Sequence, residues 1–302
     1  MKVNKSMGTN WALLAVNNKL EQLRRSIMGE VVRDIEHNGN GYHPNSWTAH
    51  ALNFVRMLTV GDPSKIVPYF KLFKEGNSKL PFLSWSTLPG VNCPGAGPCL
   101  IWCYSFKAWR YPAAYFRQLQ NTILERNAPG VIAAELDKIL NTKKYVARRV
   151  DLRLYVDGDF PNLSIMQDWF QLLEDRPRVA AYGYSKSLPM FHQYVARYGH
   201  VPGNYALNAS QGGKHDNLFK SLEKYDFFRG TFETVDIGKK IAAHKMTNED
   251  KRKARKAAGS RKVTDSRKVF ICPGPCGSCT SAGHACGNLE VFKNTRIITP
   301  IH

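Results

Sequence analysis

Three cysteines lie within eleven residues, and their spacing is suited to binding a metal cluster. Cys93, Cys99 and Cys103 are separated by five and then three residues, and the loop between them contains two glycines and two prolines. A [4Fe-4S] cluster is held by thiolates a few residues apart. Three thiolates leave one iron without a protein ligand, and such an open iron can bind a substrate or a cofactor.

Two other interpretations of this loop remain open at the level of sequence. A zinc ion would need a fourth ligand if it were structural, and His43 or His192 could supply it. Alternatively, the three cysteines are buried or redox-active thiols without a metal. The pattern favours an iron-sulfur cluster.

Four further cysteines form a second group near the end of the 302-residue chain. Cys272, Cys276, Cys279 and Cys286 span fifteen residues and supply all the soft ligands that one metal centre needs. We expect either a second [4Fe-4S] cluster or a zinc ion here. Zinc would be bound by the four cysteines or by three of them with His284.

The composition is that of a cytoplasmic protein with reduced thiols. The first apolar stretch, residues 11–16, is too short for a signal peptide, and no stretch approaches the roughly 18–20 apolar residues of a membrane span. We therefore expect no membrane partner. Clustered cysteines in the cytoplasm indicate metal binding before disulfides.

The chain is strongly basic and its positive charge is uneven. Lys and Arg outnumber Asp and Glu by 43 to 24, and residues 251–268 hold nine basic residues against one acidic residue. Such a run attracts polyanions, so DNA or RNA is the expected partner. The expected contacts are Lys251, Arg252, Lys253, Arg255, Lys256, Arg261 and Lys262. The alternative is a solvated, partly disordered loop that aids solubility.

Hydrophobic periodicity divides the chain into three parts. Residues 1–78 carry helical patterns at 10–37, 46–59 and 64–73. Residues 79–245 alternate strand-like and helix-like runs, which predicts an α/β core. Residues 246–302 contain the basic run, expected as a loop, and the four-cysteine tail.

The alternation in the core predicts parallel strands with helices outside the sheet. Strands are expected at 82–86, 152–156, 179–184, 205–208 and 231–235, and helices at 117–125, 131–140, 165–173, 190–198 and 218–224. In such folds the chemistry collects at the carboxyl ends of the strands. Asp157, Asp159, Asn208 and Ser210 stand at strand ends and are candidate site residues.

Several short motifs resemble those of known iron-sulfur proteins. The three-cysteine loop follows a strand, has Trp102 before its last cysteine, and precedes an Asp157-Gly-Asp159 motif at a strand end. This order resembles the radical S-adenosylmethionine enzymes. Taken with Leu83-Ser-Trp-Ser86 and Tyr182-Gly-Tyr-Ser-Lys186, it is more closely similar to the gene-product-eighty-eight type of phage and plasmid proteins, from about residue 80 to the end.

The resemblance implies a partial (β/α) barrel, a cofactor and an electron donor. Cys93, Cys99 and Cys103 would hold three irons, and the fourth iron would bind S-adenosylmethionine. Asp157 and Asp159 would hold its amino group, with Asn208 and Ser210 near its ribose. For the two aspartates, a strand-ending turn or a cap of the next helix is the equal alternative.

The usual cysteine spacing of that superfamily, with three and then two residues between cysteines, occurs at Cys272, Cys276 and Cys279. Only 23 residues follow Cys279, whereas 199 follow Cys103. We therefore assign the open cluster to the first group.

The sequence thus predicts an iron-sulfur protein of a phage or plasmid, similar to radical S-adenosylmethionine enzymes, that acts on or beside nucleic acid. The alternative is a nucleic-acid-binding protein without catalytic activity, which serves replication or maintenance of a mobile element and uses both cysteine groups as metal staples.

Overall fold

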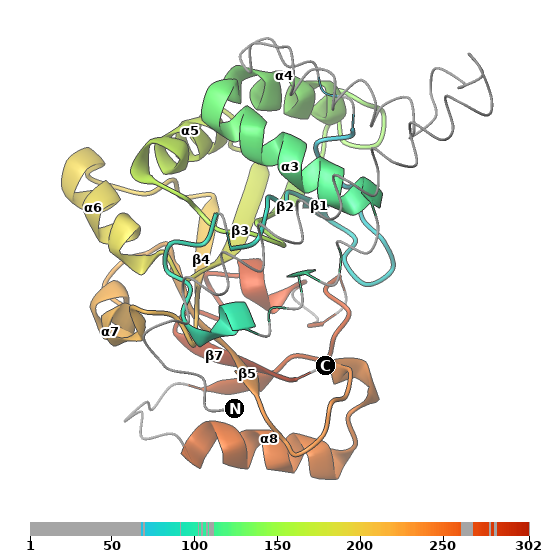
Figure 1. Cartoon of the computed structure of the whole chain (residues 1–302), viewed down its shortest axis with the longest axis vertical. Helices are drawn as coiled ribbons and strands as arrows, with labels where there is room; N and C mark the ends of the chain where they lie inside the picture. The colour runs from blue at the N-terminus through green and yellow to red at the C-terminus, as the bar shows by residue number, and fades with distance from the viewer. Residues whose placement is uncertain are drawn as a thin grey trace, which may run out of the picture.

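Seven parallel strands form one open sheet in the computed structural model (Figure 1). The structure describes residues 68, 70–90, 92–101, 103, 105–106, 108, 112–260, 268–277, 279–280 and 283–301. The strand order is β1-β2-β3-β4-β5-β7-β6, and each neighbouring pair is parallel. The strands are β1 (Leu83–Ser84), β2 (Val150–Leu154), β3 (Val179–Ser185), β4 (Tyr205–Ser210), β5 (Phe228–Val235), β6 (Val269–Ile271) and β7 (Thr295–Pro300). The predicted α/β class with a parallel sheet is confirmed.

Helices follow the strands in alternation through most of the described chain. They are α3 (Pro112–Asn127), α4 (Pro129–Leu140), α5 (Leu163–Glu174), α6 (Leu188–Tyr198), α7 (Phe219–Leu222) and α8 (Asn248–Ser260). Within the described residues, short 3-10 helices occur in the connections: η3 (Pro98–Ile101), η5 (Asp216–Leu218), η6 (Ala243–Lys245) and η7 (Ala285–Gly287). Across the described ranges, no helix combines the length and the hydropathy that a membrane span requires.

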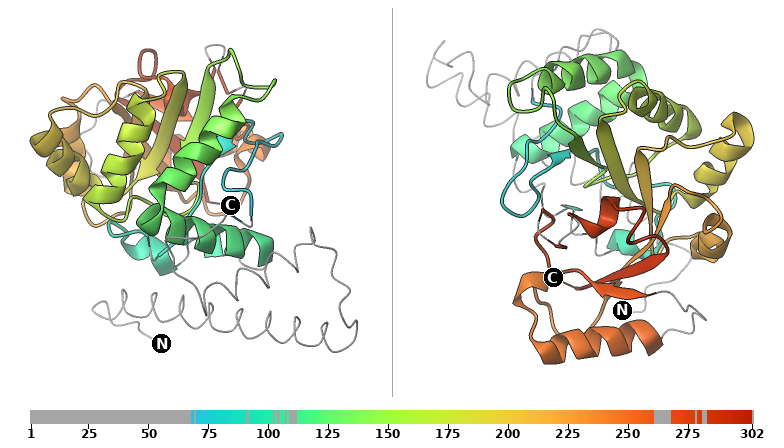
Figure 2. Two further views of the ribbon diagram at one scale, coloured as in Figure 1. Left: turned by 90° about the horizontal axis from the view of Figure 1, so that it is seen from above. Right: turned by 180° about the vertical axis from the view of Figure 1, so that it is seen from behind.

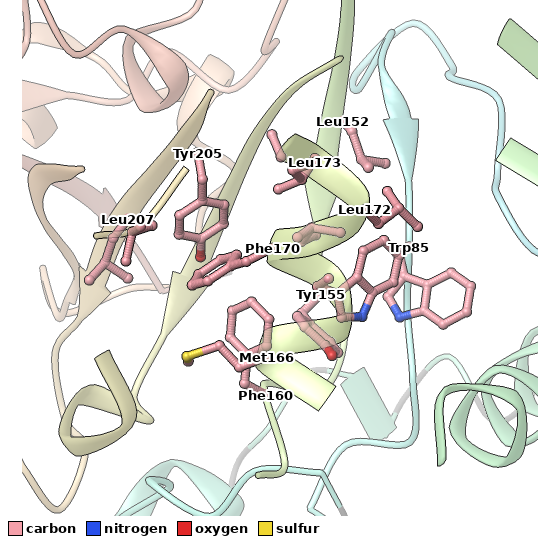
Figure 3. Packing of buried hydrophobic residues seen from close by; sticks show 14 of the residues in the cluster. Trp85, Leu152, Tyr155, Phe160, Met166, Phe170, Leu172, Leu173, Tyr205 and Leu207 are labelled. Atoms are coloured by element: carbon pink, nitrogen blue, oxygen red, sulfur yellow. The ribbon is translucent and has the colours of Figure 1, made fainter. Parts of the chain in front are cut away.

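One face of the sheet, the helix face, is covered by α3 to α7 and contains the main core (Figures 1 and 2). The strands alternate accordingly: Leu152 and Leu154 of β2 are fully buried, whereas Asp151 and Arg153, which alternate with them, are only partly buried. Helix α5 packs its apolar side on the sheet, and Figure 3 shows Phe170 and Met166 among the aromatic rings that fill this layer. The helix starts at Asn162, whose side chain accepts a hydrogen bond from Ile165 N at 2.9 Å.

The opposite face, the tail face, carries the side chains that alternate with the core residues. The four-cysteine tail segment, residues 272–286, lies across it, and η7 within that segment contacts β3 and β4. Figures 1 and 2 show this red segment on the side of the sheet away from α3 to α6. The helices and the tail segment therefore sandwich the sheet.

The helix predicted at 64–73 is wrong for residues 70–73. Residues 70–73 are not helical, because helix α3 holds this segment through its side chains. Gln120 accepts from Phe70 N at 3.0 Å and donates to Phe70 O at 2.9 Å, and Lys74 pairs with Ser84 beside β1. The other helices predicted before residue 68 lie outside the described residues.

The basic run differs from the expected loop in its first part. Residues 248–260 form α8, which opens with a reciprocal cap: Asp250 N donates to Thr247 Oγ1 at 3.2 Å, and Thr247 N donates to Asp250 Oδ2 at 3.0 Å. Ala254 and Ala258 are buried against Val235 and Ile298. Strands β6 and β7 after α8 complete the same sheet as β1 to β5.

A buried carboxyl group in the core gives a pH-dependent prediction. Glu125 accepts hydrogen bonds from Tyr155 and Asn92, and burial raises its pKa from an ordinary 4.5 to about 8. As the pH rises from about 4.5 to about 8 the unfolded chain ionises first, so the free energy of unfolding falls by about 1.4 kcal/mol per pH unit. Above that range the loss is complete.

Glu125→Gln cannot ionise and is expected to flatten this decline. The measurement is the urea midpoint of unfolding at pH 6 and pH 8, with Glu290→Gln, a change at an exposed carboxylate, as the control. An equal decline in Glu125→Gln and the wild-type protein would contradict the assignment to Glu125.

Candidate metal centres and basic helix

The three-cysteine loop is seated on the carboxyl ends of β3 and β4. Lys214 N donates to Gly95 O at 3.0 Å, and Ala96 forms an antiparallel bridge with Gly213. Gly95 approaches the chain so closely that a Cβ there would stand 1.9 Å from the carbonyl oxygen of Lys186. Only glycine fits, so this residue fixes the loop at the edge of the sheet where α/β folds collect their chemistry.

The three thiols of this loop lie close enough to influence one another. Burial raises the pKa of Cys93 well above its usual value, and the charges of Asp159, Cys103 and Cys99 raise it further. Burial also raises the pKa of Cys103, with smaller contributions from Cys99 and Asp157. The structure thus brings together the cysteine loop and the acidic motif that the sequence singled out separately.

A bend directly after β2 positions Asp157 near the three-cysteine loop. Tyr155 has a φ of 51°, a left-handed conformation that is unusual for a tyrosine. Its hydroxyl donates to Glu125 Oε2 at 3.0 Å, which anchors the bend in the core. Asp157 then accepts from Gln118 Nε2 at 3.0 Å, and burial raises the pKa of Asp157. The bend therefore places a carboxyl group beside Cys103.

Asp159 has a different environment, because four donors occupy both of its carboxylate oxygens. They are Ser185 Oγ at 2.7 Å, Lys186 N at 2.8 Å, Phe160 N at 2.8 Å and Ser187 N at 3.1 Å. Three of these donors belong to the turn between β3 and α6. Asp159 thus ties the end of β2 to the start of α6, whereas the cap of the next helix, α5, is Asn162 and not Asp159.

Asn208 and Ser210 project from β4 on the tail face, away from the helices. Ser210 Oγ accepts from Lys186 Nζ at 2.6 Å, and the same ammonium donates to Gln211 O at 2.7 Å. Asn208 Nδ2 donates to Cys286 O at 2.9 Å. The predicted cofactor residues therefore divide: the two aspartates lie by the three-cysteine loop, whereas Asn208 contacts the four-cysteine segment.

The tail segment connects both ends of the sheet. Cys272 N donates to Ile298 O of β7, and Cys276 N donates to Lys79 O just before β1, each at 2.9 Å. Together with the bond from Asn208, these contacts hold the segment over the tail face at three places. Its position there is not visible in the sequence, because the contacts depend on strands that are far apart in the chain.

The four thiols of this segment also influence one another. Burial raises the pKa of Cys272 to about 12, and the charges of the other three thiols add to the effect. Burial likewise raises the pKa of Cys276 and of Cys279. A bound metal would remove these protons, because only thiolates are ligands.

The histidines proposed as extra ligands have other partners. His284 Nδ1 accepts from Gly287 N at 3.1 Å, and its Nε2 lies 3.4 Å from Asp151 Oδ1. His192 Nε2 lies 2.9 Å from Ser221 Oγ on the opposite face of the sheet. This arrangement favours four cysteines over three cysteines and His284 at the second centre. His43 lies outside the described residues.

In the described part of the chain, no group of three or more His, Cys, Asp or Glu side chains is arranged to hold a single metal ion. Within each cysteine group the thiols nevertheless act on one another electrostatically.

Helix α8 presents the basic residues of the third candidate site. Arg252, Lys253, Arg255 and Lys256 are exposed and Lys251 is partly buried. Lys253 also pairs with Glu249 at 2.9 Å across one helical turn. Arg261 and Lys262 lie outside the described residues.

Sequence reasoning assigned no role to three polar residues near the cysteine groups, although two of them, Tyr184 and Lys186, belong to the motif Tyr182-Gly-Tyr-Ser-Lys186. Lys186 joins the end of β3 to β4, Tyr184 OH donates to Cys286 Sγ at 2.7 Å, and the Arg153 guanidinium lies 4.7 Å from the centre of the Tyr184 ring. The signal for Arg153 and Tyr184 is that they interrupt apolar strands at alternate positions, and the signal for Lys186 is its place just after the predicted strand at 179–184.

In a comparison with protein families, residues 64–289 match the family described as gene product 88. This range includes the three-cysteine loop, the sheet through β6 and all four cysteines of the tail segment. Comparison with functionally described proteins and with solved structures gives no match.

Proposed function

The chain belongs to the gene product 88 family, and we propose that it is a phage- or plasmid-type iron-sulfur protein that acts on or beside nucleic acid. The open centre would be a [4Fe-4S] cluster bound by Cys93, Cys99 and Cys103. The single observation that carries the proposal is the seat of this loop on the carboxyl ends of β3 and β4, beside Asp157.

The donor set is suitable for such a cluster. The three thiols are partly buried, the charges of Cys99 and Cys103 act on Cys93, and Gly95 packs against the backbone of Lys186. When bound, the cluster would supply one-electron reduction of a molecule held at its open iron. S-adenosylmethionine is the cofactor that we propose there, and an electron donor would be needed as a partner.

The protein's own residues would orient that cofactor. Asp157 is the carboxyl group best suited to accept hydrogen bonds from its amino group, because it lies by Cys103. Asp159 would act indirectly by holding the turn after β3, since its two oxygens are already satisfied by four donors. Lys186 would stiffen the same edge through its bonds to Ser210 and Gln211.

A second centre would be held by Cys272, Cys276, Cys279 and Cys286, as a [4Fe-4S] cluster or as zinc. All four potential ligands come from the tail segment, so the centre would be closed to substrate. Its contacts with β7, with the chain before β1 and with β4 support a stabilising role across the sheet.

A second candidate function rests on α8. Four exposed basic side chains on one capped helix support binding to DNA or RNA even without catalysis. In this alternative both cysteine groups would be structural metal staples in a protein for replication or maintenance of a mobile element.

The two candidates differ in the metal and in its open site. The protein is purified without oxygen, and iron, acid-labile sulfide and zinc are measured per chain. Electron paramagnetic resonance spectra of the reduced protein are then recorded with and without S-adenosylmethionine. We expect iron and sulfide, and a spectrum that changes when S-adenosylmethionine is added.

Cys103→Ser should abolish the response to S-adenosylmethionine, whereas Cys286→Ser should leave it. Zinc alone without sulfide would exclude the open cluster and leave the non-catalytic alternative. Iron with a spectrum that ignores S-adenosylmethionine would keep the cluster but exclude this cofactor.

A further inference from the structure

Two polar side chains of the tail face converge on one cysteine of the tail segment. Tyr184 of β3 donates its hydroxyl hydrogen bond to Cys286 Sγ at 2.7 Å. Asn208 of the neighbouring strand β4 donates to the backbone oxygen of the same residue at 2.9 Å. Both the sulfur and the backbone of Cys286 are therefore held by the sheet rather than by the tail segment itself.

The hydroxyl of Tyr184 is a suitable donor for a thiolate. A phenol is a neutral hydrogen-bond donor, and the Tyr184 hydroxyl oxygen lies 2.7 Å from Cys286 Sγ. A hydrogen bond from a neutral donor to a metal-bound sulfur stabilises the charge on that sulfur. It does so without competing for the metal.

Arg153 supplies positive charge at the same place. Its guanidinium lies 4.7 Å from the centre of the Tyr184 ring, and the hydroxyl of that tyrosine donates to Cys286 Sγ. Four thiolates around zinc or an iron-sulfur cluster leave a net negative charge, which is costly to bury without a nearby cation. Arg153 is a partly buried cation of β2 that meets this need.

The orientation of the Asn208 amide is itself fixed by other residues of the sheet. Asn208 Oδ1 accepts from Arg229 Nε at 2.7 Å, and Arg229 Nη1 donates to Thr295 O at 2.6 Å. Arg229 is fully buried, so these bonds hold the amide of Asn208 with its nitrogen toward Cys286. The support of Cys286 thus extends from β3 through β4 to β5 and β7.

We propose that Tyr184 and Arg153 are the outer-shell residues that retain metal at the centre formed by Cys272, Cys276, Cys279 and Cys286. The inference rests on the proposed function in assuming that this second centre binds metal. It adds that the sheet, through one hydroxyl and one guanidinium, determines how tightly the metal is held. These are positioning residues, because neither is a ligand.

The test compares two tyrosines on the same strand. Tyr184→Phe removes the bond to Cys286 and keeps the ring. Tyr182→Phe is the matched control, since Tyr182 lies two residues earlier on the same face of β3 and its ring centroid is 4.7 Å from that of His284. Full-length proteins are purified without oxygen, and the transfer of metal to an excess of a chelator is followed with time.

Outer-shell substitutions typically weaken metal binding about 10–100-fold. We expect Tyr184→Phe to weaken retention at the second centre by about this factor, and Tyr182→Phe to retain metal like the wild-type protein. Arg153→Gln should also weaken retention, whereas Arg153→Lys, which keeps the charge, should weaken it less. The metal fraction that Cys286→Ser removes identifies the second centre, and circular dichroism verifies that each variant is folded.

The outcomes separate the inference from the proposed function. If the wild-type protein holds metal that Cys286→Ser removes, but Tyr184→Phe and Tyr182→Phe release it at the same rate, the role of Tyr184 is refuted and the second centre stands. If Cys286→Ser changes no metal content, the second centre itself is refuted, and the inference with it.

Discussion

Glu233→Ala is expected to lower the free energy of unfolding by about 3–5 kcal/mol, because it leaves a buried arginine without its counter-charge. Glu233 and Arg296 are 1% and 6% exposed, and Arg296 Nη2 lies 2.6 Å from Glu233 Oε2. The same nitrogen donates to Ala258 O at 2.7 Å, near the end of α8. Losing this amount would remove a large part of the total stability of an ordinary domain.

The double variant Glu233→Met/Arg296→Leu tests the reason for the loss. It removes both charges, so most of the stability lost in Glu233→Ala should return. The measurement is equilibrium unfolding in urea, with Glu135→Ala as the control, since Glu135 pairs with the exposed Lys138 and such pairs contribute about 0–1 kcal/mol. A double variant as unstable as the single one would mean that packing, rather than the unpaired charge, causes the loss.

The sequence predicted the main α/β core well because its signal is local. Hydrophobic runs such as 179–184 and 165–173 correspond to β3 and α5 with small differences at their ends. These runs are apolar on the side that packs into the helix-face core, and periodicity reports that burial directly. The cysteine loop beside Asp157 followed from the same rule, since both stand at carboxyl ends of parallel strands.

The elements after residue 245 could not be predicted in this way. The buried apolar residues of helix α8 are Ala254 and Ala258, so its apolar side is too small to stand out among five basic residues. Strand β7 was missed because it is defined by its pairing with β5 and β6, which a local sequence pattern does not report. The path of the tail segment over the sheet depends on the same distant strands.

The predicted cofactor residues illustrate a second limit of sequence reasoning. Asp159 and Asn208 were both predicted from their positions at the ends of strands. In the structure, the Asp159 carboxylate accepts hydrogen bonds from the turn after β3. The Asn208 amide instead bonds to Cys286 and Arg229. Position at a strand end indicates which edge or strand a side chain occupies. It does not indicate which face of the sheet the side chain points to, or whether the side chain already has hydrogen-bond partners within the protein.

Substituting glutamine for the four exposed basic residues of α8 is expected to weaken binding to nucleic acid strongly and to reduce its salt dependence. Each phosphate contact contributes about 0.9 to the slope of log affinity against log salt for duplex DNA, and about 0.7 for single strands. If each of these side chains meets one phosphate, the slope should fall by roughly 3–4 for a duplex. Binding of a labelled oligonucleotide at several salt concentrations measures it.

The helix itself should survive these substitutions. Arg252, Lys253, Arg255 and Lys256 are exposed, whereas the contacts that attach α8 to the sheet are made by Ala254, Ala258 and the bond from Arg296 to Ala258 O. Glutamine also has a helix propensity close to that of lysine and arginine. An unchanged urea midpoint would therefore separate loss of binding from loss of structure.

The matched control removes equal charge elsewhere on the surface. Lys138, Lys143, Lys220 and Lys224 are exposed residues outside α8, and the glutamine variant of all four lowers the net charge of +19 by the same amount. If binding depends on α8, this variant should keep most of the wild-type salt slope. Equal losses in both variants would mean that net charge alone attracts nucleic acid, and α8 would then be a solvated surface helix rather than a binding site.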